Sequence, residues 1–292
     1  MSPVPVPRVA AGVAALDGRI WVVGGLTPGR TATSRVDVYD PLTDTWSIGP
    51  PLPEAVHHVA LVGADDRLWA IGGHRGVPFR PVASVYSLDP DDSRWRVRQP
   101  LPRARGAAAA AAVGDDIYVL GGQAEEETAI RTVERYDPDD DRWEPLPPMP
   151  TPREHLAAVA MDGVVYAIGG RIGSLSSNLS TLEALDTDTL RWETLPSMPT
   201  PRGGLAATVY RGRIHALGGE SPARAFDAHE AYDPGERRWL PQSPLPTARH
   251  GLGAAVAAGT LYSVAGGVEP GLVAGAIVEA LAPPRAPIRP SD

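Results

Sequence analysis

Short apolar segments recur along the whole chain, separated by turns rich in Asp, Gly and Pro. Over residues 106–148 they read GAAAAAAV, DIYVLGG, TVERYDP and RWEPLP. Segments of roughly four to eight residues between turn signals are typical of strands and too short for ordinary helices. The alanine run 107–112 has high helical propensity of its own, but the equivalent segments VAAGVAAL and GGLAATV are rich in Gly and Val. We therefore predict strands throughout, with small side chains near a crowded axis.

These segments belong to an internal repeat, which Gly-Gly pairs mark. The pairs fall at 24–25, 72–73, 121–122, 169–170, 218–219 and 266–267. Their spacings are 48, 49, 48, 49 and 48 residues, so six periods account for nearly the whole chain. The approximate repeats are 4–51, 52–100, 101–148, 149–197, 198–244 and 245–292.

Two further features keep their place in the repeat. An arginine precedes five of the Gly-Gly pairs by 16 or 17 residues, namely Arg8, Arg105, Arg153, Arg202 and Arg249, whereas the second repeat has Val56 there. In five repeats a Tyr or Leu is followed seven residues later by Trp, as in Tyr39 and Trp46. A buried Trp removes up to about 250 Å² from water, so we predict that the tryptophans anchor the packing of the core.

A Gly-Gly pair after a strand such as IYVLGG, followed by Tyr and Trp and preceded by PTPR, resembles the kelch repeat. Six such repeats resemble a six-bladed kelch β-propeller. The resemblance implies an all-β fold of four-stranded antiparallel blades in one domain over residues 1–292. In the last repeat the Trp position falls on Ile288 within a Pro-rich segment. We therefore predict that the sixth blade is degenerate in its outer strand, and that contacts between blades one and six close the ring.

The resemblance leaves function open, because kelch propellers include protein-binding modules, a sialic acid mutarotase, copper radical oxidases and iron-dependent specifier lyases. The chain has no Cys, and its 27 basic residues are all Arg. Without Cys it cannot form a thiolate site or the Tyr–Cys crosslink of the copper oxidases. The Glu-x3-Asp-x3-His motif of the specifier lyases is also missing from the sequence.

The net charge of −8 argues against a nucleic-acid partner. No apolar run reaches the roughly 18 residues of a membrane-spanning helix. The Arg, Ala, Gly and Pro bias is typical of a GC-rich bacterial genome. We therefore expect a monomeric bacterial cytoplasmic protein without nucleic-acid or membrane partners.

By resemblance, the segments joining the repeats and the loops after each Gly-Gly pair share one face, around the mouth of a central channel. The five repeat arginines could form a ring of guanidiniums there that holds an anion. Alternatively, each arginine is a repeat residue that pairs with a carboxylate or carbonyls of a neighbouring blade. Further ligand-binding candidates on this face are His57, His74, Arg75, Gln123, Arg171 and Glu220.

Histidines fall at two neighbouring positions of the connecting segments. His58 and His155 lie two residues after the position of the repeat arginine. His57, Glu154 and His250 lie one residue after that position. Because neighbours in a strand point to opposite faces, we expect His58 and His155 to converge. By the same argument Arg153 shares the side of His155, whereas Glu154 faces away and His250 does not join the pair.

Two functions remain open at this point. The first is a binding propeller that holds an anionic small molecule or an acidic peptide or protein at an Arg- and His-lined mouth. The alternative is a small-molecule enzyme of bacterial metabolism, mutarotase-like or another isomerase, or a lyase or cyclase. Its catalytic residues would be His58, His155, Glu154 and His250, since a carboxylate can orient an imidazole that titrates near pH 6.5. No cofactor is required, but His58, His155 and His250 would bind a divalent metal if their nitrogens lay about 2.1 Å from one ion.

Overall fold

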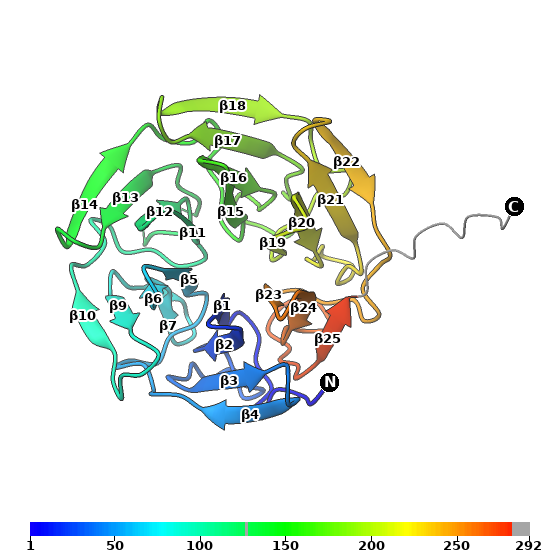
Figure 1. Ribbon diagram of the computed structural model, residues 1–292. Coiled ribbons are helices and arrows are strands. Elements are labelled where there is room, and N and C mark those ends of the chain that lie inside the picture. The colour runs from blue at the N-terminus through cyan, green and yellow to red at the C-terminus, as the bar shows by residue number, and fades with distance from the viewer. Residues whose placement is uncertain (126–127, 282–292) are drawn as a thin grey trace, which may run out of the picture.

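The protein forms a ring of six β-sheets around a central axis (Figure 1). The structure, a computed structural model, describes residues 1–125 and 128–281, and it contains strands and no helices in that range. This confirms the predicted all-β propeller. In each blade the first strand lies nearest the axis and later strands lie progressively farther out (Figure 1). No helix that could cross a membrane is found within the described ranges.

The strands follow the sequence repeat. Blade one contains β1 (Gly12–Leu16), β2 (Arg19–Val23), β3 (Val36–Asp40) and β4 (Thr45–Ile48). Blade two contains β5 (Ala60–Ala64), β6 (Arg67–Ile71), β9 (Val85–Leu88) and β10 (Arg96–Arg98), with a hairpin of β7 (His74–Arg75) and β8 (Arg80–Pro81). Blade three contains β11 (Ala109–Val113), β12 (Asp116–Leu120), β13 (Val133–Asp137) and β14 (Arg142–Leu146). Blade four contains β15 (Ala157–Met161), β16 (Val164–Ile168), β17 (Leu182–Asp186) and β18 (Arg191–Leu195). Blade five contains β19 (Ala206–Tyr210), β20 (Arg213–Leu217), β21 (His229–Asp233) and β22 (Arg238–Pro241), and blade six contains β23 (Gly253–Ala257), β24 (Thr260–Val264) and β25 (Val278–Leu281).

The alanine-rich segment of the third repeat is the innermost strand β11, as predicted, and it pairs antiparallel with β12. Ala111 lies opposite Tyr118 in this pair. Its small side chains fit where six innermost strands crowd around one axis. Here the environment of the ring overrides the helical propensity of alanine.

The hydrophobic core lies between neighbouring blades rather than inside any single sheet. One buried cluster joins Trp21 and Val38 of blade one to Leu68 of blade two. Another joins Ile20 of blade one to Tyr262 of blade six. Each blade is therefore stabilised by apolar contacts on both faces, including those at the seam between the last blade and the first.

Blade six has three strands among the described residues, whereas the other five blades have four. The predicted defect at Ile288 lies in 282–292, outside the described residues. The N-terminal segment nevertheless ties the ring together, because Val4 N–H donates to the carbonyl of Ala276 at 2.8 Å and Arg8 N–H donates to Gly275 at 2.9 Å. This confirms that contacts between blades one and six close the ring.

A continuous circle of backbone hydrogen bonds surrounds the axis at one end of the channel. It runs through one residue from each blade. We call these six residues the mouth ring: Ala10, His58, Ala107, His155, Gly204 and Gly251. Each N–H donates to the carbonyl of the preceding blade's member at 2.7–3.0 Å, and Ala10 donates to Gly251. All six residues have positive φ, between 50° and 66°. This conformation turns the backbone sideways, so that one blade can reach the next.

The outer-strand tryptophans link consecutive blades. The indole N–H of Trp143 donates to the carbonyl of Gln99 at 2.9 Å, and Trp192 donates to Pro147 at 2.8 Å. Trp95 and Trp239 donate in the same way to Pro50 and Pro196, whereas Trp46 donates to Ser2 of the N-terminal segment. Trp21, Trp69 and Trp95 are buried as expected, but the other four tryptophans are only half-buried. These four pack against the core clusters from their outer side.

Candidate functional site

The connecting segments and the loops after the Gly-Gly pairs meet at one end of the channel. In five blades a connecting residue forms an antiparallel bridge with the residue after the Gly-Gly pair, and in blade six it bridges the second glycine of the pair. The pairs are Val9 with Leu26, His57 with His74, Gly106 with Gln123, Glu154 with Arg171, Gly203 with Glu220, and His250 with Gly267. The expected shared face is therefore present, and it surrounds the mouth ring.

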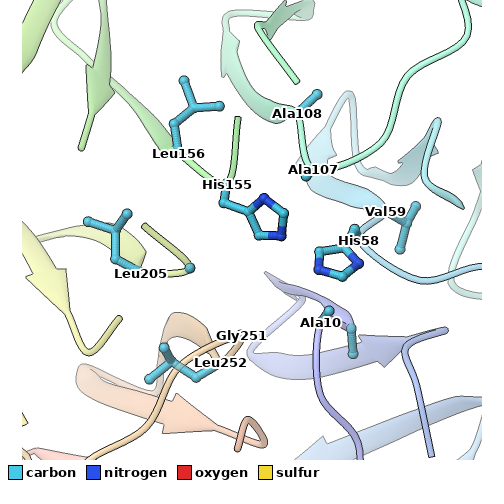
Figure 2. A pocket seen from close by; sticks show the side chains of 12 residues that line it. Ala10, His58, Val59, Ala107, Ala108, His155, Leu156, Leu205, Gly251 and Leu252 are labelled. Carbon is cyan, nitrogen blue, oxygen red and sulfur yellow. The ribbon is translucent and has the colours of Figure 1, made fainter. Parts of the chain in front are cut away.

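A cavity of about 120 Å³ opens inside the mouth ring, and each blade contributes two consecutive residues to its lining. Among these twelve residues only His58 and His155 have polar side chains. Their rings point toward one another from alternate blades (Figure 2), with centroids 4.7 Å apart and planes at 75°. The predicted convergence of the two imidazoles is confirmed.

The neighbours of His58 determine which of its nitrogens carries the proton. His57 Nε2 lies 2.9 Å from the carbonyl oxygen of Gly76, which only accepts, so His57 must donate from Nε2. A neutral His57 then has an unprotonated Nδ1, which lies 2.5 Å from Nδ1 of His58. His58 therefore donates from Nδ1, and its Nε2 presents a lone pair.

The same reasoning applies to His155, whose Nδ1 lies against Oε2 of Glu154. A carboxylate oxygen accepts, so Nδ1 carries the proton and Nε2 presents a lone pair. The contact corrects the expectation that Glu154 faces away from His155. Strand alternation does not hold at this point, because His155 has a φ of 51° and β15 begins only at Ala157.

Both mouth histidines are neutral at pH 7. Burial lowers the pKa of His58 and of His155 well below 6.5, and the positive charge of Arg171 lowers both further. The other histidines nearby act in the same direction. The cavity is thus lined by a pair of uncharged hydrogen-bond acceptors rather than by cations.

A row of charged side chains lies behind His155. Arg171 Nε donates to Glu154 Oε1 at 3.0 Å, and Arg171 Nη1 donates to Glu220 Oε1 at 2.8 Å. Glu220 Oε2 in turn accepts the backbone N–H of Gly271 at 2.9 Å and lies 3.3 Å from His250 Nδ1. Two predicted ligand-binding residues, Arg171 and Glu220, are therefore brought together as a buried support for the mouth.

His250 belongs to this supporting row and not to the mouth pair, as the strand parity predicted. Its Nε2 lies 2.9 Å from the carbonyl oxygen of Glu269. Across residues 1–125 and 128–281, no three His, Cys, Asp or Glu side chains are arranged to hold a metal ion. The metal site predicted from His58, His155 and His250 is therefore not assembled.

On the other side of the mouth, His57 and His74 pack with Phe79 in an aromatic cluster beside His58. The ring centroids of His57 and Phe79 are 4.5 Å apart, and those of His74 and Phe79 are 5.2 Å apart. His74 is fully buried, and neither of its ring nitrogens has a hydrogen-bond partner. Burial lowers the pKa of His74 to about 3. Gly106 makes room for this ring, since a Cβ there would collide with His74.

The remaining two predicted ligand-binding residues take no part in the cavity lining. Arg75 is exposed and pairs with Glu54, which also accepts from the hydroxyl of Tyr86. Gln123 is half-buried and pairs with Gly106 through backbone hydrogen bonds of 2.7 and 3.0 Å. Both lie in the rim around the mouth.

The five repeat arginines are not at the mouth, and the expected guanidinium ring is wrong. Each side chain has no exposed surface and enters its own blade, where it pairs with a carboxylate of the third strand. The pairs are Arg8 with Asp37, Arg105 with Glu134, Arg153 with Glu183, Arg202 with Glu230, and Arg249 with Glu279. Arg153 also donates to the carbonyls of Gly169 and Thr181 at 3.2 and 2.9 Å. Arg153 therefore does not share the side of His155, and the carboxylate belongs to the same blade rather than to a neighbour.

The family model for the KLHDC2/KLHL20/DRC7 Kelch-repeats domain matches residues 57–267 of the chain. The Kelch motif model matches residues 7–53. The chain belongs to the kelch-repeat family. The two matches together span five blades and the inner part of the sixth.

Individual relatives match this kelch chain over shorter segments. Kelch-like protein 25 of Xenopus tropicalis is 35% identical over 103 residues, which is 32% of this chain and 17% of that protein. Kelch-like protein terF of Aspergillus terreus is 37% identical over 78 residues, covering 25% of this chain and 17% of that protein. Beta-scruin of Limulus polyphemus is 34% identical over 77 residues, covering 24% of this chain and 8% of its own length. The chain therefore spans less than a fifth of each of these relatives.

One signal within the kelch repeats could have revealed the arginine–carboxylate pairs. The second residue of the third strand is acidic in each of the five blades that carry the arginine. Blade two has Val56 in place of the arginine and Tyr86 in place of the acid. The joint loss of both partners in one repeat indicates that they interact within the blade.

Proposed function

We propose that this kelch propeller is a binding module, and that its channel mouth takes a hydrogen-bond-donating group of a protein partner between His58 and His155. Kelch propellers generally bind proteins. The observation that carries the proposal is the pair of neutral imidazoles that line one cavity with their ring centroids 4.7 Å apart. An N–H or O–H group satisfies such acceptors, whereas another acceptor is repelled.

The size of the cavity favours one chemical group of a larger partner over a whole small ligand. Small-molecule pockets are typically about 300–1,000 Å³, whereas the mouth cavity has about 120 Å³. A side chain that projects from a protein surface can enter this space while the rest of the partner contacts the rim. Rim side chains such as Arg75 and the half-buried Phe79 are available for that contact.

The proposal differs from the anionic ligand that the sequence suggested. The five guanidiniums that would attract an anion are buried and paired inside the blades. Arg171 is shared between two carboxylates, Glu154 and Glu220. A carboxylate entering the cavity at pH 7 would meet the lone pairs of two unprotonated imidazole nitrogens and no proton on either. We therefore place neutral or positive donors ahead of acidic groups as partners for the mouth.

Titration with short peptides tests this ranking. Acetylated and amidated glycine pentapeptides with a central Gln, Ser, Ala or Glu would be added at pH 7, while the ¹⁵N resonances of the histidine rings are followed by NMR. The Gln and Ser peptides are expected to shift the Nε2 signals of His58 and His155 and to leave those of His215 and His229 in place. The Ala and Glu peptides are expected to have little effect.

The matched variant is the double substitution His58→Ala and His155→Ala. Alanine is the mouth-ring residue of blades one and three, so the fold accepts it there. This variant should lose peptide binding and keep the thermal stability of a folded propeller. A Glu peptide that binds the native protein as tightly as the Gln peptide would contradict the proposal and restore an acidic partner.

A second candidate, a small-molecule enzyme, is favoured by the contact between His155 and Glu154. A carboxylate that holds Nδ1–H leaves Nε2 free to act as a general base toward a group in the cavity. The reaction would be mutarotase-like, another isomerisation or an elimination. Panels of sugar acids incubated in D₂O would reveal activity as deuterium uptake or anomer exchange. If one of these sugar acids is turned over, His155→Ala should lower the rate by at least about 100-fold. Unchanged turnover would exclude His155 as the base.

A further inference from the structure

The charged row behind the mouth contains more negative than positive charge. Glu154 and Glu220 each form an ion pair with the single guanidinium of Arg171, at 3.0 and 2.8 Å. The two carboxylate side chains are 4% exposed and the guanidinium side chain is 12% exposed. Two carboxylates against one guanidinium leave one negative charge without a counterion in a largely dry place.

The other groups that contact the row are neutral and do not cancel this charge. His155 donates Nδ1–H to Glu154, and the backbone N–H of Gly271 donates to Glu220 at 2.9 Å. His250 lies 3.3 Å from Glu220, but burial lowers the pKa of His250 more than Glu220 and the Glu269 carbonyl raise it. Within the described ranges, Arg171 is the one permanently charged cation paired with either carboxylate.

A buried and uncompensated charge attracts a counterion to the nearest accessible space. Here that space is the mouth cavity, which shares His155 with the charged row. An ammonium group carries three N–H donors and no acceptor. In the cavity an ammonium group can offer donors to both imidazoles, His58 and His155, and its charge compensates the row. Exposed cations of the rim, such as Arg75, are paired or screened by solvent.

We propose that the channel mouth selects a primary ammonium group, a lysine side chain or an N-terminal amine of the partner, over neutral donors. The inference rests on the proposed function, because it names the donor that the mouth prefers. Charge-assisted hydrogen bonds are roughly twice as strong as neutral ones. The expected preference for an ammonium over a neutral donor of the same length is therefore about tenfold or more in Kd.

Matched glycine pentapeptides with a central Lys or Nε-acetyl-lysine provide the test, because the two differ in charge but both carry an N–H donor. A second pair, with a free and an acetylated N-terminus around a central Ala, separates the N-terminal source from the side-chain source. At 20 mM salt the Lys peptide should bind at least about tenfold more tightly than its acetylated counterpart. Its affinity should fall at 200 mM salt, whereas that of the acetyl-lysine peptide should not.

Equal affinity of the Lys and acetyl-lysine peptides would exclude the lysine side chain as the preferred group and leave the proposed function standing. If neither these nor the neutral Gln and Ser peptides shift the His58 and His155 signals, the proposed function itself fails. If the free N-terminus binds and the Lys side chain does not, the partner offers its N-terminal amine. If neither of the two ammonium groups exceeds its acetylated match, the inference is wrong.

The variant Glu220→Gln removes the excess charge, but its amide has a single oxygen, which can accept from Arg171 or from the N–H of Gly271 and not from both. The variant should bring the Lys and acetyl-lysine affinities to near equality by weakening the binding of the Lys peptide. Glu193→Gln is the matched control, because Glu193 is exposed and pairs with Arg237 in the outer part of the propeller. A Lys preference that survives Glu220→Gln would contradict the proposal that the uncompensated carboxylate causes the preference. If this variant does not fold, the salt dependence of Lys-peptide binding to the native protein tests the same proposal.

Discussion

Replacing Arg153 by Ala is expected to lower the free energy of unfolding by about 3 to 5 kcal/mol, because it leaves a buried charge without its partner. Arg153 Nη2 donates to Glu183 Oε2 at 2.5 Å, and the Glu183 side chain is only 1% exposed. The same guanidinium donates to two backbone carbonyls, of Gly169 and Thr181. Without Arg153 the Glu183 carboxylate would keep only the Thr151 hydroxyl, and the Thr181 carbonyl only the N–H of Gly169, so a buried negative charge would lose its cation inside blade four. Urea denaturation followed by tryptophan fluorescence measures the loss.

An exposed ion pair provides the comparison. Arg237 pairs with Glu193 at 2.6 Å, and both side chains are more than half exposed. Arg237→Ala should cost no more than about 1 kcal/mol. A cost for Arg153→Ala that is as small as that of Arg237→Ala would show that the buried pairs do not stabilise the blades.

The double variant Arg153→Val with Glu183→Tyr should recover much of the loss, because removing both partners leaves no isolated charge. Blade two already has this combination at the equivalent positions, as Val56 and Tyr86. The loss is therefore expected to come from the unpaired carboxylate and not from the missing volume alone.

Acidification from pH 7 to pH 5 is expected to lower the free energy of unfolding by several kcal/mol. Burial lowers the pKa of all seven histidines in the native protein, to about 3 for His74 and about 4 for His215. In the unfolded chain they titrate near 6.5, so below that pH the unfolded state binds more protons and stability falls. Each such group costs about 1.4 kcal/mol per pH unit. Between pH 7 and 5, His74 and His215 together account for about 4 kcal/mol.

The variant His74→Phe isolates one of these contributions. Neither ring nitrogen of His74 has a partner, and the ring packs among aromatic neighbours, so Phe can occupy the site. Urea denaturation at pH 7 and pH 5 should show an acid loss about 2 kcal/mol smaller than in the native protein. Phe79→Leu alters the same cluster without removing a titrating group, and it should keep the native acid loss. Equal losses in His74→Phe and the native protein would contradict the neutral state of this histidine.

The sequence repeat predicted the fold in detail because six copies report the same strand pattern. A single alanine-rich segment such as 107–112 is ambiguous, but its five equivalents are not. The same alignment predicted that His58 and His155 converge, since a shared repeat position becomes a shared position around the axis. Parity along a strand also separated His250 from this pair.

Strand parity failed where the backbone leaves the extended conformation. The mouth-ring residues have positive φ, so Arg153 turns into its blade and Glu154 reaches back to His155. Nothing local in the sequence marks this turn, because Ala, His and Gly all occupy the position. The carboxylate partners of the arginines lie 28 to 30 residues farther along the chain. The sequence indicates that pairing only in blade two, where Val56 replaces the arginine and Tyr86 replaces the acidic residue.

The mouth ring also has a consequence for how the protein can come apart. In an open array of repeats, a terminal unit has a single neighbour and can separate on its own. Here every blade gives an N–H to one neighbour and a carbonyl to the other, and the seam between blades one and six is joined in the same way as the rest. No blade is therefore terminal at the axis, and detaching any of them breaks two links at once. Partial unfolding of this propeller must begin at its periphery, away from the histidine pair.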